Sequence, residues 1–271
     1  MEANVHIITG LVSAAKNIFR CIERAGFQVT DIVLEPLASS FACLHEDEKE
    51  VGVALIDIGG GTTDIAVFED QTIRHTAVIA VAGNKVTDDI RKGISVMRDQ
   101  AEQLKRQFGI ALVDLSDPDE HIEVPGIGSR PEKVVARDTL AQVIQPRLEE
   151  ILEFAQIEIS RSGYARHLGV GCVVTGGGSL IPGTAELAAD VLGMEARIGR
   201  PMGLGGGLVE EVSDPKFSTG VGLVLYGMQP EIIGGTTLSE EVEAHSSGDR
   251  SSGETLVRRI AMRMKSWFDE L

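Results

Sequence analysis

The stretch VALIDIGGGTTDIAVF, residues 53–68, places three glycines and two threonines between two apolar runs. Each run is rich in the residues of buried strands. Consecutive glycines let a backbone approach a ligand closely and point several N–H groups into one concavity, which suits phosphate oxygens. The threonines add hydroxyl donors. The candidate phosphate ligands are Gly59, Gly60, Gly61, Thr62 and Thr63.

Asp57 precedes these glycines and changes the chemistry that the turn can perform. A carboxylate repels a phosphate unless a cation lies between them. Mg²⁺ takes oxygen ligands and keeps several of its waters. We therefore expect Asp57 to hold Mg²⁺ through water while the turn amides hold phosphate. A glycine-rich hairpin that binds nothing is the alternative, although a tight hairpin needs only one or two glycines.

A second glycine turn occurs in VVTGGGSLIPG, residues 173–183. A strand that runs into glycines and then a helix is a common nucleotide-contact geometry, and also a common turn of α/β proteins. Together with the first turn it suits a nucleotide clamped between two lobes. The candidate contacts are Gly176, Gly177, Gly178 and Ser179.

The elements that must position these turns alternate between strand and helix, which predicts an α/β fold. We expect strands at residues 5–10, 29–36, 72–83 and 195–201 and on either side of the glycine turn in 53–68, and helices at 13–26, 37–50, 84–94, 98–109 and 215–228. Residues 170–193 predict a strand, the second glycine turn and a helix. Breakers divide residues 110–136 into a small, loop-rich β unit. Residues 137–163 predict a long helix that Pro146 should break or kink.

The composition is that of a globular protein and excludes several classes. The chain has 271 residues, 43% of them hydrophobic, and a formal net charge of −16. This charge argues against a general nucleic-acid binder. The N-terminus lacks the pattern of a secretory signal, so we expect a cytoplasmic location. Cys21, Cys43 and Cys172 are widely spaced in apolar contexts, which favours buried thiols over a disulfide framework or a zinc site.

The C-terminal region differs in character from the rest of the chain. Residues 234–252 are polar and predict a flexible linker. When residues 256–271 are plotted as a helix, apolar side chains fall within one arc of roughly 140° and basic ones fall opposite. Such a helix suits a membrane interface with anionic lipid, or could pack on the protein itself. Its expected lipid contacts are Leu256, Ile260, Met264, Trp267, Phe268 and Leu271, with Arg258, Arg259, Arg263 and Lys265 on the basic side.

Several motifs carry a resemblance to a known superfamily. DIGGGTTDIAVF resembles the second phosphate motif of the actin, heat-shock chaperone and sugar-kinase superfamily, and VVTGGGSLIPG resembles its adenosine motif. LEPLASS resembles the first connecting helix, and AEQLKRQFG the helix beside adenine. HTAVIAVAGNKVTDDI, EVPGIGSRP and TLAQVIQPRLEEIL together resemble the bacterial cell-division family FtsA. The resemblance implies the actin-like ATPase fold of that superfamily and covers nearly the whole chain.

The resemblance also implies roles for individual residues around ATP and Mg²⁺. Asp57 would lie near the metal and the attacking water, and Glu35 would take the place of the family's water-orienting residue. A surface carboxylate at a helix start is the other interpretation of Glu35. Glu102 and Lys105 would border ribose and adenine, or be ordinary surface residues of a helix. The remaining implied contacts are Gly59 to Thr63 with phosphate, Gly83 and Asn84 with the ribose side, and Gly176 to Ser179 with adenosine.

Members of the superfamily begin with a first phosphate motif and a full first lobe, whereas this chain opens at what resembles a later strand. We therefore expect an N-terminally truncated form with an incomplete first lobe. The expected domains are residues 1–50 (the end of the first lobe), 51–233 (the second actin-like lobe), 234–252 (the linker) and 253–271 (the membrane-targeting helix).

The function implied by the resemblance is that of a nucleotide-binding structural adaptor with weak ATPase activity at most. Such a protein would anchor FtsZ to the cytoplasmic face of the membrane at the division site, self-associate into actin-like polymers, and help recruit later division proteins. Two alternatives share the fold: a phosphotransferase of the sugar or acetate kinase type, and a pilus-assembly protein. The first needs an acid/base residue near the phosphates, and the histidines of this chain are scattered.

Overall fold

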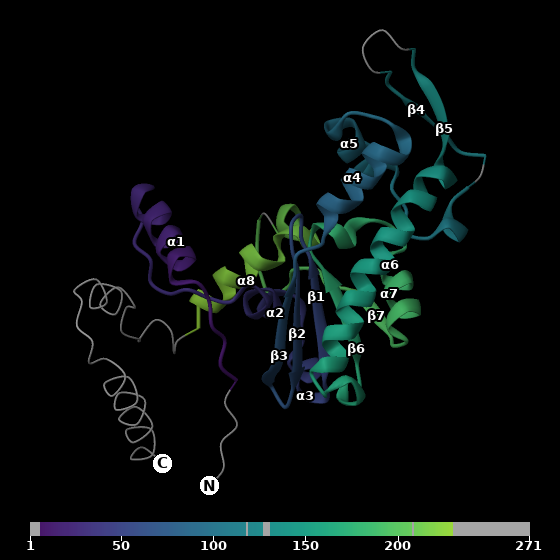
Figure 1. Ribbon diagram of the computed structural model, residues 1–271. Helices are drawn as coiled ribbons and strands as arrows, with labels where there is room; N and C mark the ends of the chain where they lie inside the picture. The colour runs from purple at the N-terminus through teal and green to yellow at the C-terminus, as the bar shows by residue number, and fades with distance from the viewer. Residues whose placement is uncertain (1–5, 118, 127–130, 208, 230–271) are drawn as a thin grey trace, which may run out of the picture. The chain divides into compact units, whose positions relative to one another are not determined.

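The computed structural model describes residues 6–117, 119–126, 131–207 and 209–229 (Figure 1). They form two compact units, residues 6–8 with 33–229, and residues 9–32. The predicted linker 234–252 and the predicted amphipathic helix 253–271 lie outside the described residues. The expected domain boundary at residue 50 stays a prediction. In the described ranges, no helix combines the length and apolar character needed to cross a bilayer.

Helix α1, Val12–Arg24, confirms the helical spacing of its sequence. The chain turns away after it at Gly26, which adopts a φ of 85° and donates its N–H to the carbonyl of Glu23. The strands expected on either side of α1 are wrong where the chain is described, because residues 6–10 and 29–34 form no regular element. A strand needs a partner for its backbone groups, and none of the described strands pairs with these residues.

A five-stranded sheet forms the centre of the larger unit, in the order β3-β2-β1-β6-β7. β2 pairs antiparallel with both β1 and β3, whereas β1, β6 and β7 run parallel to one another. The strands predicted around both glycine turns are confirmed. The bounds are β1 Val53–Ile58, β2 Thr63–Glu69, β3 Thr72–Ile79, β6 Gly171–Thr175 and β7 Ala196–Ile198.

Helices cover both faces of this sheet (Figure 1). Alternate residues of β1 point to opposite faces: Val53 and Leu55 join the apolar cluster under α2 and α8, while Ala54 and Ile56 join the larger cluster on the other face. The helices of the first face are α2 Glu35–Cys43 and α8 Ser218–Gly227; those contributing to the second cluster are α4 Gly83–Ile94, α5 Arg98–Phe108, α6 Arg137–Arg161 and α7 Thr184–Leu192.

The smaller elements agree with the sequence in part. The expected β unit is a hairpin of β4, His121–Val124, and β5, Lys133–Ala136. Of the break or kink expected at Pro146, the break is wrong, because α6 continues through this residue. The kink stays a prediction. Ile144 and Leu148 on either side of Pro146 are fully buried, and this packing outweighs the hydrogen bond that proline cannot make. Short 3₁₀ turns are η1 Val113–Leu115, η2 Ala165–His167, η3 Gly177–Leu180, η4 Glu210–Val212 and η5 Pro215–Phe217.

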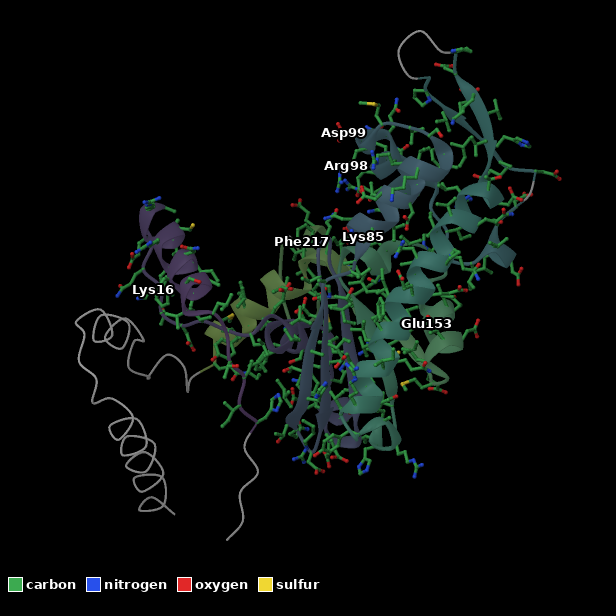
Figure 2. All side chains as sticks on the ribbon, in the orientation of Figure 1. Lys16, Lys85, Arg98, Asp99, Glu153 and Phe217 are labelled. Atoms are coloured by element: carbon green, nitrogen blue, oxygen red, sulfur yellow. The ribbon has the colours of Figure 1, made fainter. Side chains whose placement is uncertain are left out.

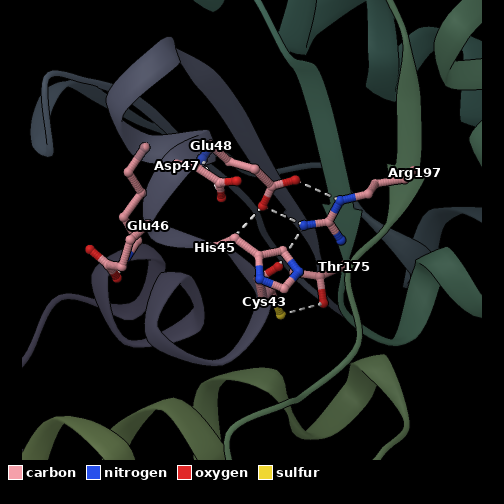
Figure 3. A network of polar contacts seen from close by, with 8 residues as sticks. Cys43, His45, Glu46, Asp47, Glu48, Thr175 and Arg197 are labelled. Atoms are coloured by element: carbon pink, nitrogen blue, oxygen red, sulfur yellow. Dashed lines mark hydrogen bonds and ion pairs between the residues drawn. The ribbon is translucent and has the colours of Figure 1, made fainter.

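The single helix expected at residues 37–50 is two helices, α2 and α3, the latter Glu46–Val51. Glu48 explains the break, because its carboxylate accepts a hydrogen bond from the backbone N–H of His45 at 2.8 Å. Arg197 on β7 donates to both carboxylate oxygens of Glu48, at 2.8 and 2.6 Å, and to the carbonyl of Cys43 at 2.8 Å (Figure 3). This two-pronged ion pair ties the end of α2 and the start of α3 to the sheet.

We expect Glu48→Gln to lower the free energy of unfolding at pH 7 by about 1–3 kcal/mol. Burial opposes ionisation of Glu48, but the hydrogen bonds from Arg197 and His45 outweigh it and lower its pKa from the ordinary 4.5. A lowered pKa contributes stability above that value, and the contribution is lost as the pH falls through the folded pKa. The difference in free energy of unfolding between Glu48→Gln and wild type, measured by urea denaturation, should therefore shrink in acid.

The control is Glu50→Gln, because Glu50 is exposed. Equal effects of both variants at pH 7 would refute the role of the Glu48–Arg197 pair.

Candidate functional site

Three carboxylates gather where β1 and β2 meet. Asp57, near the end of β1, lies directly opposite Asp64 on β2, and both are buried. Asp57 shares the strand alternation of Val53 and Leu55, so both aspartates face α2. Glu35, the first residue of α2, is exposed, as its interpretation as a surface carboxylate at a helix start expects. Its pKa is nevertheless raised, by the partial burial of its carboxylate and by the charges of Asp64 and Asp57.

Hydroxyl groups partly offset this crowding. Burial raises the pKa of Asp57, and the charge of Asp64 adds to the effect, while hydrogen bonds from Ser39 and Thr219 oppose it. Burial also raises the pKa of Asp64, opposed by the side chain of Thr62. Like charges placed this close favour the neutral form of each carboxyl group, and a cation that approached them would favour the anionic form.

The carboxylates fit a hydrated Mg²⁺ better than a metal held by side chains alone. No group of three His, Cys, Asp or Glu within the described ranges has the arrangement of a metal cage. Mg²⁺ commonly keeps several waters and takes one or two carboxylates together with substrate phosphates. Asp57 lies near the end of β1, just before the glycine turn, so it could supply one such carboxylate.

The first glycine turn is held firmly by the start of α4. Gly59 donates its N–H to the carbonyl of Thr62 at 3.0 Å, which closes the turn. The N–H groups of Gly83 and Asn84 bond to the carbonyls of Gly59 and Gly60, at 3.0 and 2.8 Å. The buried hydroxyl of Thr63 donates to the carbonyl of Val81 at 2.8 Å, so it points into the protein backbone. The carbonyls of Gly59 and Gly60 therefore already accept hydrogen bonds from the protein backbone.

The second glycine turn crosses the end of β1, and glycine is required there. Gly176 has a φ of 84°, and a Cβ on it would clash with Asp57 Oδ1. A Cβ on Gly178 would clash with the side chain of Ile58. The hydroxyl of Ser179 donates to the carbonyl of Gly176 at 2.8 Å and closes this turn. Parallel pairing of β1 and β6, with Asp57 opposite Thr175, brings the two turns side by side.

A cavity of about 370 Å³ lies between the turns, within the size range of small-molecule sites. In Figure 2, Lys85 of α4 and Phe217 before α8 both lie at this end of the sheet. The predicted site residues that line the cavity are Gly59, Gly60, Gly83, Asn84, Glu102, Lys105, Gly177 and Gly178. Residues that the sequence did not single out also line it: Val86, Arg106, Leu148, Leu180, Ile181, Asp214 and Lys216.

Lys105 and Glu102 on α5 form a connected polar group beside α4. The Lys105 ammonium donates to the Gly83 carbonyl at 3.1 Å and to Thr87 Oγ1 at 2.8 Å, and pairs with Glu102 Oε2 at 2.7 Å. Burial opposes ionisation of Glu102, but hydrogen bonds from Lys105 and Thr87 lower its pKa. The Lys105 side chain is only 11% exposed, so it is not an ordinary surface lysine. The contacts of both residues with ribose and adenine stay predictions.

Two further residues contact the carboxylates directly and were missed by the sequence analysis. Ser39 lies one helical turn after Glu35, so the helical period of α2 could have placed it on the same face. Thr219, in the first turn of α8, is distant in sequence from every motif. Only the packing of α8 against α2 brings it to Asp57, and no local pattern signals that.

The central sheet, its flanking helices and the paired glycine turns are those of the actin-like ATPase fold. The solved structure of MreB5 of Spiroplasma citri bound to ADP matches with a TM-score of 0.66 at 21% identity, over 83% of this chain and 69% of that chain. Residues 54–222 match the family described as cell division protein FtsA. The chain belongs to that family.

Relatives in the family match over most of this chain. The cell division protein FtsA of Pseudomonas aeruginosa is 42% identical over 267 residues, which is 98% of this chain and 62% of that protein. The protein of the same name from Escherichia coli strain K12 is 41% identical over 251 residues, which is 90% of this chain and 60% of that protein. This chain therefore spans about three fifths of the length of these relatives.

We expect Asp64→Asn to stabilise the protein at pH 7 by up to about 1 kcal/mol when nucleotide and divalent cations are absent, because it removes a like charge opposite Asp57. The pKa of Asp64 is raised from its ordinary 3.8 in the folded protein, so ionisation of this group costs stability. The cost grows as the pH rises from 3.8 through the folded pKa. The gain in thermal unfolding should therefore be larger at pH 7 than at pH 4. Asp190→Asn, on an exposed residue of α7, is the control. A variant less stable than this control would contradict the repulsion.

Proposed function

We propose that this chain binds ATP with Mg²⁺ in the cavity between the two glycine turns. The observation that supports this most strongly is the pairing of β1 with β6, which sets Gly59 and Gly60 against Gly177 and Gly178 across one cavity. The structure of MreB5, which shares the fold, was solved with bound ADP, and this also supports the proposal. Backbone amides of the turns would donate to the phosphates, and Lys105 and Glu102 would border the ribose and adenine.

The carboxylates would have separate roles in this site. Asp57, at the edge of the first glycine turn, would hold Mg²⁺ through water. Bound Mg²⁺ neutralises phosphate charge, which is the chemistry it supplies to phosphoryl transfer. Glu35 approaches from α2 and would orient an attacking water, and its raised pKa places it nearer the range of a useful general base. We propose weak hydrolysis at most, because the principal role is structural.

We expect Asp57→Asn to weaken the binding of ATP in the presence of Mg²⁺ by about tenfold or more, because the charge that faces the hydrated cation is lost. Asparagine keeps the shape of the buried side chain, and isothermal titration calorimetry measures the change. Asp190→Asn is the matched control on an exposed aspartate. Equal affinities of Asp57→Asn and wild type would exclude the role assigned to Asp57.

We further propose that the protein is an adaptor of cell division. It would attach FtsZ to anionic lipids at the cytoplasmic face of the membrane at the division site, assemble into actin-like polymers, and help recruit later division proteins. Membership of the FtsA family supports this role over the phosphotransferase and pilus-assembly alternatives. The sequence of residues 253–271 supports the membrane part, because it combines an apolar side that includes Trp267 and Phe268 with a basic side.

We expect replacement of Arg258, Arg259, Arg263 and Lys265 by glutamine to weaken binding to vesicles that contain anionic lipid by about 1 kcal/mol per removed charge. Binding to vesicles of neutral lipid should change little, since only the electrostatic attraction is lost. Co-sedimentation measures binding to both kinds of vesicle. In a second assay, added FtsZ should sediment with anionic vesicles when the wild-type chain is present, and not with the glutamine variant. The control replaces Ser251 and Ser252 of the predicted linker by alanine. Undiminished binding of the glutamine variant would reject the membrane role of this segment.

A further inference from the structure

The hydroxyl groups that the structure describes around the Asp57 carboxylate contact only one of its two oxygens. Ser39, which is fully buried in α2, donates its hydroxyl to Asp57 Oδ2 at 2.8 Å. Thr219 of α8 lies with its Oγ1 3.0 Å from Ser39 Oγ and 3.5 Å from the same Oδ2. Two helices thus hold Oδ2 from the side of the sheet that they cover.

The other oxygen of the carboxylate points elsewhere. Asp57 Oδ1 lies so close to Gly176 that no side chain could be added there. Gly176 begins the turn whose next residues, Gly177 and Gly178, line the cavity. The two oxygens of Asp57 are therefore distinct: Oδ2 belongs to the helices, and Oδ1 lies on the side of the glycine turn.

We propose that Ser39 and Thr219 are positioning residues, which fix Asp57 so that Oδ1 is the oxygen presented to a metal-bound water. This inference rests on the proposed nucleotide site. A carboxylate can rotate about its Cβ–Cγ bond, and the hydrogen bond from Ser39, with Thr219 Oγ1 3.5 Å from the same oxygen, restricts that rotation before a ligand arrives. A water on the cation then meets an acceptor already in place, which reduces the cost of ordering the site.

The proton count limits what Thr219 can donate to. A hydroxyl has one proton to donate, and that of Ser39 goes to Asp57. The single proton of Thr219 has two acceptors in reach, Ser39 Oγ and Asp57 Oδ2. With either acceptor, Thr219 supports the side of the carboxylate that carries Oδ2.

A purely structural role for these hydroxyls makes a different prediction from a positioning role. If they only satisfied a buried carboxylate, their loss would loosen the fold and weaken ATP binding equally with and without Mg²⁺. If they orient Oδ1, their loss would reduce the gain in ATP affinity that Mg²⁺ produces. ATP affinity measured in EDTA and in Mg²⁺ separates the two roles.

The experiment titrates the 271-residue chain with ATP in EDTA and in Mg²⁺. We expect Thr219→Val to reduce the Mg²⁺-dependent gain in affinity by about tenfold, the size of a hydrogen bond to a charged group, and to leave the affinity in EDTA unchanged. Thr219→Ser keeps the hydroxyl and should restore the gain. Ser39→Ala should reproduce the loss, and it keeps the test valid if Thr219→Val fails to fold.

Ser218→Ala is the matched control. Ser218 precedes Thr219 in α8, and its buried hydroxyl bonds to Thr175 and to the carbonyl of Pro215 and not to Asp57. Its loss should change stability and not the Mg²⁺-dependent gain. The inference is overturned if Thr219→Val and Ser39→Ala keep the wild-type gain, or if they lose affinity equally in both conditions. A wild-type chain that does not bind ATP would instead overturn the proposed nucleotide function, and this inference with it.

Discussion

Repulsion among three carboxylates is the constraint around which this end of the molecule is organised. Asp57, Asp64 and Glu35 lie within reach of one another's charge, and burial makes each of them harder to ionise. A protein selected for stability alone would not place like charges directly opposite one another on paired strands. The cost is understandable if a cation completes the site when ligand binds, because the same charges then become favourable.

The surrounding structure limits that cost without removing it. The hydroxyl of Ser39 on α2 donates to Asp57 Oδ2, and Thr219 Oγ1 on α8 lies 3.5 Å from the same oxygen. Glycines occupy the positions where a side chain would collide with Asp57 or Ile58. The start of α4 bonds to the carbonyls of the first turn. These contacts hold the anionic groups in fixed positions, which would preorganise the proposed site for a cation and phosphates.

Local patterns in the sequence predicted the strands on either side of both glycine turns, because each depends on neighbours within a few residues. Lys105 and Glu102 needed a family resemblance, since on α5 alone they are ordinary charged residues. The strand expected at residues 29–36 failed because a strand depends on a partner that local sequence does not specify. The expected break at Pro146 failed for a related reason, since buried packing on both sides holds α6 together. Thr219 could not be predicted at all, because only tertiary packing brings α8 to Asp57.

We propose that Asp57 and the two glycine turns form one site for ATP with Mg²⁺. The decisive experiment is a crystal structure of the chain with Mg²⁺ and a non-hydrolysable ATP analogue. We expect phosphate oxygens bonded to backbone N–H groups of both turns, and a water on the metal within hydrogen-bonding distance of Asp57 Oδ1. A nucleotide bound outside the cavity between the turns, or a metal without any contact through water to Asp57, would contradict it.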